Sequence, residues 1–222
     1  MIEKTGPTLY KGESIYKIGA GGGGGEIIPE GYSKVYYLEF KSANNDNSFG
    51  FSINNLNSND KYYLTLFINS TSAGTSQFRI LEVRKDNNFV SATANINGTI
   101  NYGLNVVRTL FYGIDINMSI GNLQLDFIES GKVRVNGIDQ TLTDGPFSNG
   151  YLNYFLDHNL YQSPERLDGT KFFKFRITDF TDKLKYNFIP VVNNNTGVAY
   201  ILETMTGVLK TNNNWIAGPV IE

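Results

Sequence analysis

The chain has 222 residues, a formal net charge of −2 and no cysteine. The lack of a basic excess argues against a nucleic-acid partner, and the lack of thiols excludes disulfides, thiolate metal sites and cysteine nucleophiles. The composition leans towards Tyr, Phe, Ile, Val, Thr and Gly, and Asn recurs throughout, which favours pleated strands joined by tight turns.

Residues 1–19 predict a short N-terminal β-hairpin, because two β-prone pieces at residues 8–10 and 14–18 flank a Lys-Gly-Glu turn. A two-stranded hairpin is marginal in water, so we expect this unit to become ordered by packing on another protein. The alternative is a disordered start. The apolar residues that would make the contact are Leu9, Tyr10, Ile15, Tyr16 and Ile18.

Residues 20–26 predict a glycine-rich hinge, since residues 21–25 are all glycine and glycine has the largest backbone freedom. No Lys-Ser/Thr pair follows, so the run does not read as a phosphate loop. We expect no secretory signal peptide at the N-terminus, and no stretch approaches the roughly 18 apolar residues of a membrane span.

Residues 27–222 predict one main domain built from short strands separated by Asn, Asp, Ser and Gly clusters. Apolar and polar residues alternate most strictly at residues 114–120, and Leu123, Leu125 and Phe127 continue the pattern. After a turn, Val133 and Val135 point inward, which predicts a hairpin meander. Comparable strands are expected at residues 35–40, 49–53, 62–68, 78–83 and 105–111.

The C-terminal part adds two strands. Phe173, Phe175 and Ile177 alternate with Lys174 and Arg176, which predicts a half-buried strand. Residues 188–192 predict another, and the proline at position 190 suggests a sheet edge or a strand end. The expected fold is all-β, with two packed antiparallel sheets in a sandwich.

Several segments resemble concanavalin-A-like (laminin-G-like) jelly-roll domains of bacteriophage structural and appendage proteins. The opening Ile-Pro-Glu-Gly-Tyr segment and the Gly-Lys-Val-Arg-Val-Asn-Gly hairpin match, as does the order Phe-Lys-Phe-Arg-Ile, Phe-Ile-Pro-Val, Gly-Val-Ala-Tyr and Gly-Val-Leu. The resemblance covers about residues 28–214, and residues 9–16 look like the hairpins that precede such domains. Residues 40–45 and 200–202 depart from the family pattern, which weakens any transfer of a ligand.

The resemblance implies a structural virion protein, namely a head fibre, a capsid decoration protein or a tail appendage. It would be made in the host cytoplasm and exposed on the particle surface. Residues 1–19 would bind other virion proteins, and a homo-oligomer, with a trimer as the first expectation, would display the domain towards a host-surface glycan. The alternatives are a carbohydrate-binding module with a defined glycan specificity and, third, a polysaccharide hydrolase.

No catalytic residue is predicted, and we do not expect an enzyme. His158 is the only histidine, and no Gly-x-Ser-x-Gly motif accompanies it. The Glu-x-Asp-x-x-Glu strand of related glucanases is replaced by Asp115-x-Asn117 and Gln124-x-Asp126, neither of which puts two acids on one face.

No metal and no cofactor are predicted either. Residues 44–47 and 86–88 are rich in oxygen ligands for Ca²⁺, but Asn and Asp also favour turns for backbone reasons. Exposed aromatics can stack on a sugar ring; the alternative is that these side chains belong to the core or the sandwich rim. The candidates for glycan contact are Tyr151, Tyr154, Tyr161 and Trp215.

Overall fold

The computed structural model describes residues 26–40, 56, 60–68, 121–128, 132–141, 169–211 and 215–221 with their side chains. It describes the backbone alone for residues 13–15, 53–55, 75–85, 88–97, 101–109, 112–119, 129 and 150–158. All regular structure in these residues is β, with antiparallel pairing and no helix. The all-β fold class is therefore confirmed.

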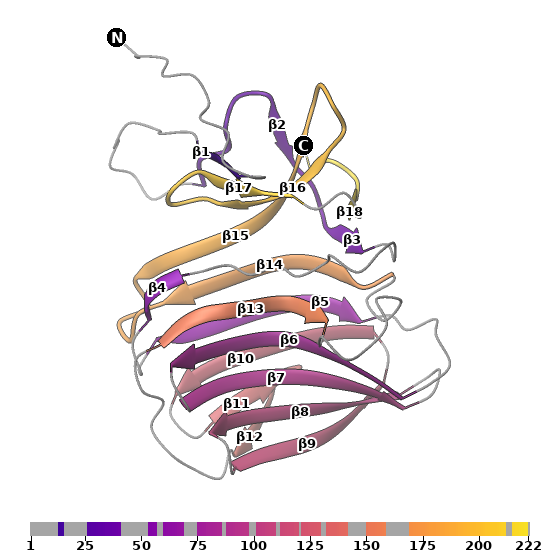
Figure 1. Cartoon of the computed structure of the whole chain (residues 1–222), viewed down its shortest axis with the longest axis vertical. Coiled ribbons are helices and arrows are strands. Elements are labelled where there is room, and N and C mark those ends of the chain that lie inside the picture. The colour runs from indigo at the N-terminus through magenta and orange to yellow at the C-terminus, as the bar shows by residue number, and fades with distance from the viewer. Residues whose placement is uncertain are drawn as a thin grey trace.

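The larger sheet contains 12 strands in the described part of the chain (Figure 1). Its main path runs through β1 (Glu13–Ile15), β17 (Val208–Lys210), β16 (Ala199–Glu203), β15 (Leu184–Asn193), β14 (Lys171–Thr178), β5 (Lys61–Ile68), β10 (Gly121–Glu129), β11 (Lys132–Val135) and β12 (Ile138–Thr141). Beside this path, β2 (Tyr32–Lys34) pairs with β15, and β3 (Leu38–Phe40) pairs with β14 and with β18 (Trp215–Ala217).

The second sheet contains six described strands, which cross in front of β5 and β10 to β12 in the view of Figure 1. Their order is β4 (Ile53–Leu56), β13 (Gly150–His158), β6 (Thr75–Lys85), β7 (Asn88–Asn97), β8 (Asn101–Thr109) and β9 (Tyr112–Ser119). Strands β6, β8 and β9 overlap the strands expected at residues 78–83, 105–111 and 114–120, whereas β7 and β13 were not predicted.

The central strands of the larger sheet bury one face, as their alternating patterns predict. Every second side chain is at most 4% exposed along β5, β10 and β11. The buried residues are Tyr62, Leu64, Leu66, Ile68, Leu123, Leu125, Phe127, Val133 and Val135. The meander from β10 into β11 is also confirmed, with Leu125 paired to Val135.

Strand β14 continues the core, with one difference from the expected pattern. Phe175 and Ile177 are 0% exposed, and the Phe175 ring stacks on Phe188 with centroids 5.6 Å apart. At the start of the strand, however, Phe172 is the buried residue and Phe173 is only half-buried. The regular alternation is therefore interrupted between Phe172 and Phe175.

The expectation that Pro190 marks a sheet edge or a strand end is wrong. Pro190 lies within β15, opposite Ile201 of β16. On its other side, pairing with β14 reaches Phe188, and pairing with β2 starts at Val191. Pro190 thus occupies the point where one neighbour replaces another, so its missing N–H interrupts neither ladder.

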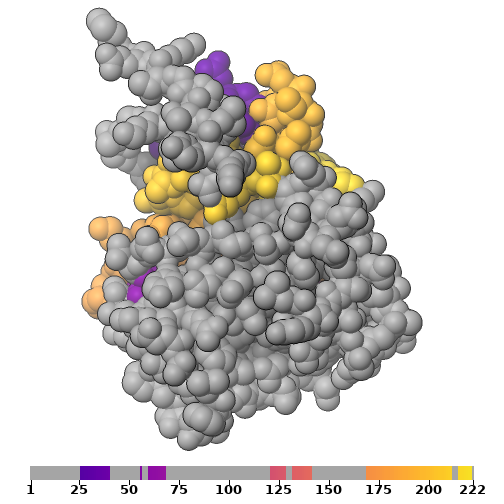
Figure 2. Space-filling view, in the orientation of Figure 1, coloured from indigo at the N-terminus to yellow at the C-terminus, as the bar shows by residue number. Residues whose placement is uncertain are grey.

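The N-terminal and C-terminal segments meet at one end of the molecule. Figure 2 shows residues 26–40 in indigo next to the orange and yellow C-terminal strands, in agreement with the pairing of β2 with β15. Strand β1 pairs with β17, with Glu13 opposite Lys210. Of the predicted anchoring residues, Ile15 lies in β1, whereas the other four, Leu9, Tyr10, Tyr16 and Ile18, lie outside the described residues.

Two buried carboxylates hold loops against this sheet. The Asp60 side chain, 2% exposed, accepts a hydrogen bond of 2.6 Å from the Lys185 ammonium. Glu203 is 4% exposed and accepts backbone N–H bonds from Met205 and Thr206 in the turn that follows it. Both carboxylates therefore have structural partners.

Candidate functional site

The outward face of the larger sheet carries aromatic, amide and charged side chains side by side. Along β5, β10 and β14, the positions between the core residues are half-buried or exposed, except Asp126, which is buried. In the register, Thr65 of β5 lies opposite Gln124 of β10 and Lys174 of β14, and Phe67 lies opposite Asn122. Residues distant in sequence thus form neighbouring rows on one surface.

Phe173 reaches this surface through a β-bulge. Phe172 pairs with Leu66 and Lys174 pairs with Thr65, so Phe173 is an extra residue without a partner in β5. Such a residue breaks the strict alternation of side chains between the two faces. As a result, Phe172 enters the core and Phe173 lies on the outward face, half-buried.

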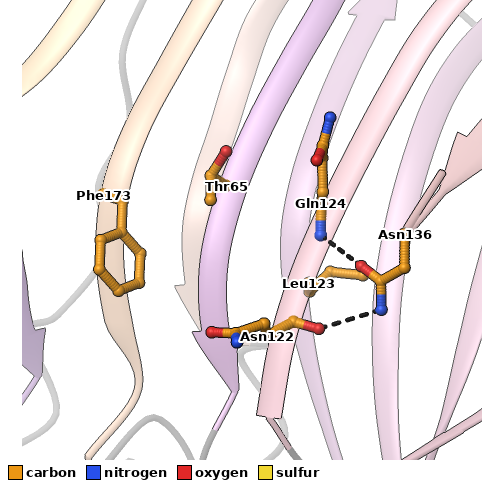
Figure 3. A pocket seen from close by; sticks show the side chains of 6 residues that line it. All are labelled: Thr65, Asn122, Leu123, Gln124, Asn136 and Phe173. Carbon is orange, nitrogen blue, oxygen red and sulfur yellow. Dashed lines mark hydrogen bonds between the residues drawn. The ribbon is translucent and has the colours of Figure 1, made fainter.

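A depression of about 390 Å³ opens beside Phe173. In Figure 3, the Phe173 ring lies at one side of it, the amides of Gln124 and Asn136 lie at the other, and the side chains of Thr65 and Asn122 lie between them. The described residues that line it are Thr65, Asn122, Leu123, Gln124, Asn136 and Phe173. The depression combines one aromatic ring with several hydrogen-bonding side chains.

Asn136 fixes one wall of the depression. It forms the turn between β11 and β12 with Gly137, and both residues have positive φ, 48° and 81°, as a type I′ hairpin turn requires. Its Oδ1 accepts a bond of 2.7 Å from the Gln124 N–H, and its Nδ2 donates a bond of 3.0 Å to the Asn122 carbonyl. The dashed lines in Figure 3 mark these two bonds, which tie the turn to β10.

The other polar side chains of the depression make fewer hydrogen bonds within the protein. Among the described residues, neither the Asn122 side-chain amide nor the Thr65 hydroxyl has a hydrogen-bond partner. The Gln124 amide donates a bond of 2.8 Å from Nε2 to Asp126 Oδ2, which orients it and leaves Oε1 as an acceptor. Both donors and acceptors are thus available to a bound molecule.

Asp126 lies on the same face and is 6% exposed. Burial raises the pKa of this carboxyl above its ordinary value, while the Gln124 hydrogen bond and the charges of Arg134, Arg176 and Lys174 act in the opposite direction. Burial is the larger effect, so ionisation of Asp126 is costly in the folded chain. Its bond to Gln124 makes it a positioning group for that amide.

Packing also restrains the Phe173 ring. Tyr37 contacts it edge to face, with centroids 6.0 Å apart and an angle of 66° between the planes. The Lys171 ammonium lies 4.3 Å from the centre of the Tyr37 ring and 3.6 Å from a Glu39 oxygen. Because Tyr37 is itself held by a cation, the aromatic side of the depression is preorganised.

A second exposed phenylalanine lies on the turn between β14 and β15. Phe180 is 69% exposed. Asp179 accepts a hydrogen bond from the Thr181 hydroxyl, which lowers the pKa of Asp179 and holds the turn. Asp182 is paired with Lys61 at 2.8 Å, and this bond lowers the pKa of Asp182 and raises that of Lys61. Phe180 does not line the depression.

Trp215, the one aromatic candidate from the sequence whose side chain is described, does not line this depression. Trp215 of β18 is 7% exposed and contacts Phe40 edge to face at 5.6 Å. Tyr151 and Tyr154 lie in β13, of which only the backbone is described, and Tyr161 lies outside the described residues. Sequence reasoning missed the depression, although the adjacent Phe172 and Phe173 were a signal that the alternation is broken.

Neither a cluster of metal ligands nor a membrane-spanning helix is found in the part of the chain that is described. Its His, Asp and Glu side chains form no group of three or more that could hold a metal ion. His158 ends β13, where the backbone alone is described, and residues 44–47, 86 and 87 lie outside the described part. No described helix is long and apolar enough to cross a membrane.

Comparison of the chain with protein-family models, curated proteins and solved structures finds no match.

Proposed function

We propose that this chain is a non-enzymatic structural protein of a bacteriophage particle that displays a lectin-like domain towards the host cell. Residues 1–19 bind other virion proteins, residues 20–26 act as the hinge, and residues 27–222 form the displayed domain. The chain is made in the host cytoplasm and exposed on the particle as a head fibre, a capsid decoration protein or a tail appendage.

A jelly-roll sandwich is the finer fold that we propose for the displayed domain. The buried face of the larger sheet supports it, because residues such as Leu64, Leu125 and Phe175 are 1% exposed or less. The six-stranded sheet lies in front of β5 and β10 in the view of Figure 1, and this overlap supports two stacked antiparallel layers. The family resemblance of the opening and closing segments points the same way.

The observation that carries the display function is the bulge at Phe173. A regular strand would have kept an aromatic residue at this point in the core, whereas the bulge places it on the outward face next to amide and hydroxyl groups that have no hydrogen-bond partner among the described residues. Bulges in proteins frequently re-aim side chains next to binding sites. An aromatic ring beside polar groups on the outward face supports the binding of another molecule there.

Particle assembly tests the proposal. Particles would be assembled with the full chain and with a variant that lacks residues 1–19, purified, and their occupancy compared by density and by quantitative immunoblotting. We expect the full chain on the particle surface and empty sites with the variant, while residues 27–222 remain soluble and melt cooperatively. Absence of the full chain from particles would reject the proposal, and normal occupancy by the variant would reject the anchor.

A carbohydrate-binding module is the second candidate, and the mixed aromatic and amide lining of the depression favours it. Such a module would bind a defined glycan but would be found in no particle. The same occupancy measurement therefore separates the two functions. The oligomeric state, measured by light scattering on intact protein, tests the expected trimer.

A further inference from the structure

We propose that the depression beside Phe173 binds one pyranose ring of a bacterial surface glycan, an inference that rests on the proposed display function and assigns it a site. The ring would stack on Phe173, and its hydroxyl groups would bond to Asn122, Thr65 and Gln124.

The Phe173 ring provides the apolar half of the site. One face of a pyranose is formed by C–H groups, which carry a small positive charge and pack on the negative face of an aromatic ring. Phe173 is half-buried and rests against Tyr37, so little side-chain freedom is lost when a ligand stacks on it. Figure 3 shows the ring beside the polar groups of the depression, where a single sugar can touch both.

The polar half suits hydroxyl groups. Each sugar hydroxyl donates and accepts, and the amide of Asn122, the hydroxyl of Thr65 and Oε1 of Gln124 together offer both functions. The Gln124 amide is oriented by Asp126, and the backbone beneath it is fixed by Asn136. These two residues are positioning residues, because they hold the groups that contact the ligand.

The surroundings disfavour peptide ligands. Strands β14, β5 and β10 each have a neighbour on both sides, so none offers an open edge for the addition of a peptide strand. Leu123 lines the depression but is 0% exposed, so its side chain offers no surface to a ligand. A volume of about 390 Å³ is near the lower limit for small-molecule sites, roughly 300 to 1,000 Å³, as a site for a single sugar ring requires.

Glycan binding by the full chain tests the inference. The protein would be screened on an array of bacterial capsular and lipopolysaccharide O-chain glycans, and the hits titrated by calorimetry. We expect saturable binding that Phe173→Ala weakens about tenfold or more and that Phe173→Trp retains. Asn122→Ala is expected to weaken binding about threefold to tenfold, the effect of one lost hydrogen bond.

Phe180→Ala is the matched control, because it removes an exposed phenylalanine from the turn that follows β14 and not from the depression. It should leave the affinity unchanged, and thermal melts would verify that every variant is folded. Absence of saturable binding to any arrayed glycan would overturn the inference, as would binding that Phe173→Ala leaves intact. Particle occupancy is measured separately, so a chain that is present on the particle but binds no glycan refutes this inference alone.

Discussion

Phe175→Ala tests whether the central strands of the larger sheet are placed in the correct register. Phe175 is 0% exposed and lies opposite Leu64 on one side and Phe188 on the other, with its ring stacked on that of Phe188. Truncation removes a complete buried ring and leaves a cavity between two paired strands. Such a loss lowers the free energy of unfolding by about 3 to 5 kcal/mol.

Thermal and urea denaturation of the purified full chain would measure this effect. In a domain of this size, each kcal/mol shifts Tm by roughly 2 to 4 °C, so the variant should melt about 6 to 20 °C below the wild type. Lys174→Ala is the control, because its side chain is exposed and a surface substitution changes stability by about 0.5 kcal/mol or less. Equal losses at the two positions would refute the assigned faces of β14.

Further predictions concern charge and turn geometry. Asp60→Ala leaves the half-buried Lys185 ammonium without this carboxylate and should cost about 3 kcal/mol in urea denaturation, whereas Glu26→Gln, in an exposed ion pair, should cost less than about 1 kcal/mol. Because the pKa of Asp126 is raised in the folded chain, the folded state holds this proton more tightly, and stability falls as the pH rises through the folded pKa. Asp126→Asn should therefore match the wild-type Tm near about pH 3 and exceed it at about pH 7; a constant difference across this range would contradict the assignment. Gly137→Ala meets no atom within 4 Å but forces a non-glycine residue to φ +81°, so it should cost about 1 to 2 kcal/mol, and no change in Tm would argue against the type I′ turn.

The strands with strict alternation were predictable from the sequence. In residues 62–68, 123–127 and 133–135, the apolar core residues lie two places apart, and the buried face follows directly from the pleat. The exchange of neighbours at Pro190 could not be predicted in this way, because it depends on β2 replacing β14 beside β15. Strand pairing over long sequence distances is not encoded in local patterns.

The depression could not be predicted from the sequence, because it too depends on strand pairing. Thr65, Asn122 and Phe173 are far apart in the chain, and only the pairing of β5 with β10 and β14 brings them together. A bulge of one residue also reverses the expected orientation of Phe173. Sequence reasoning instead selected aromatic residues such as Trp215, which packs against Phe40. The anchoring role of residues 1–19 stays a prediction.

The extra residue at the bulge has an evolutionary consequence. Deleting the codon for Phe173 would bring Phe172 and Lys174 into consecutive pairing with Leu66 and Thr65, and every other pair between β14 and β5 would keep its partner. A lineage can therefore gain or discard the aromatic ring in a single in-frame step, without rebuilding the sheet around it. If the proposed display function holds, variants that bind different surfaces are expected to differ by a one-residue gap at this position, and a comparison of β14 length among related sequences would reveal it.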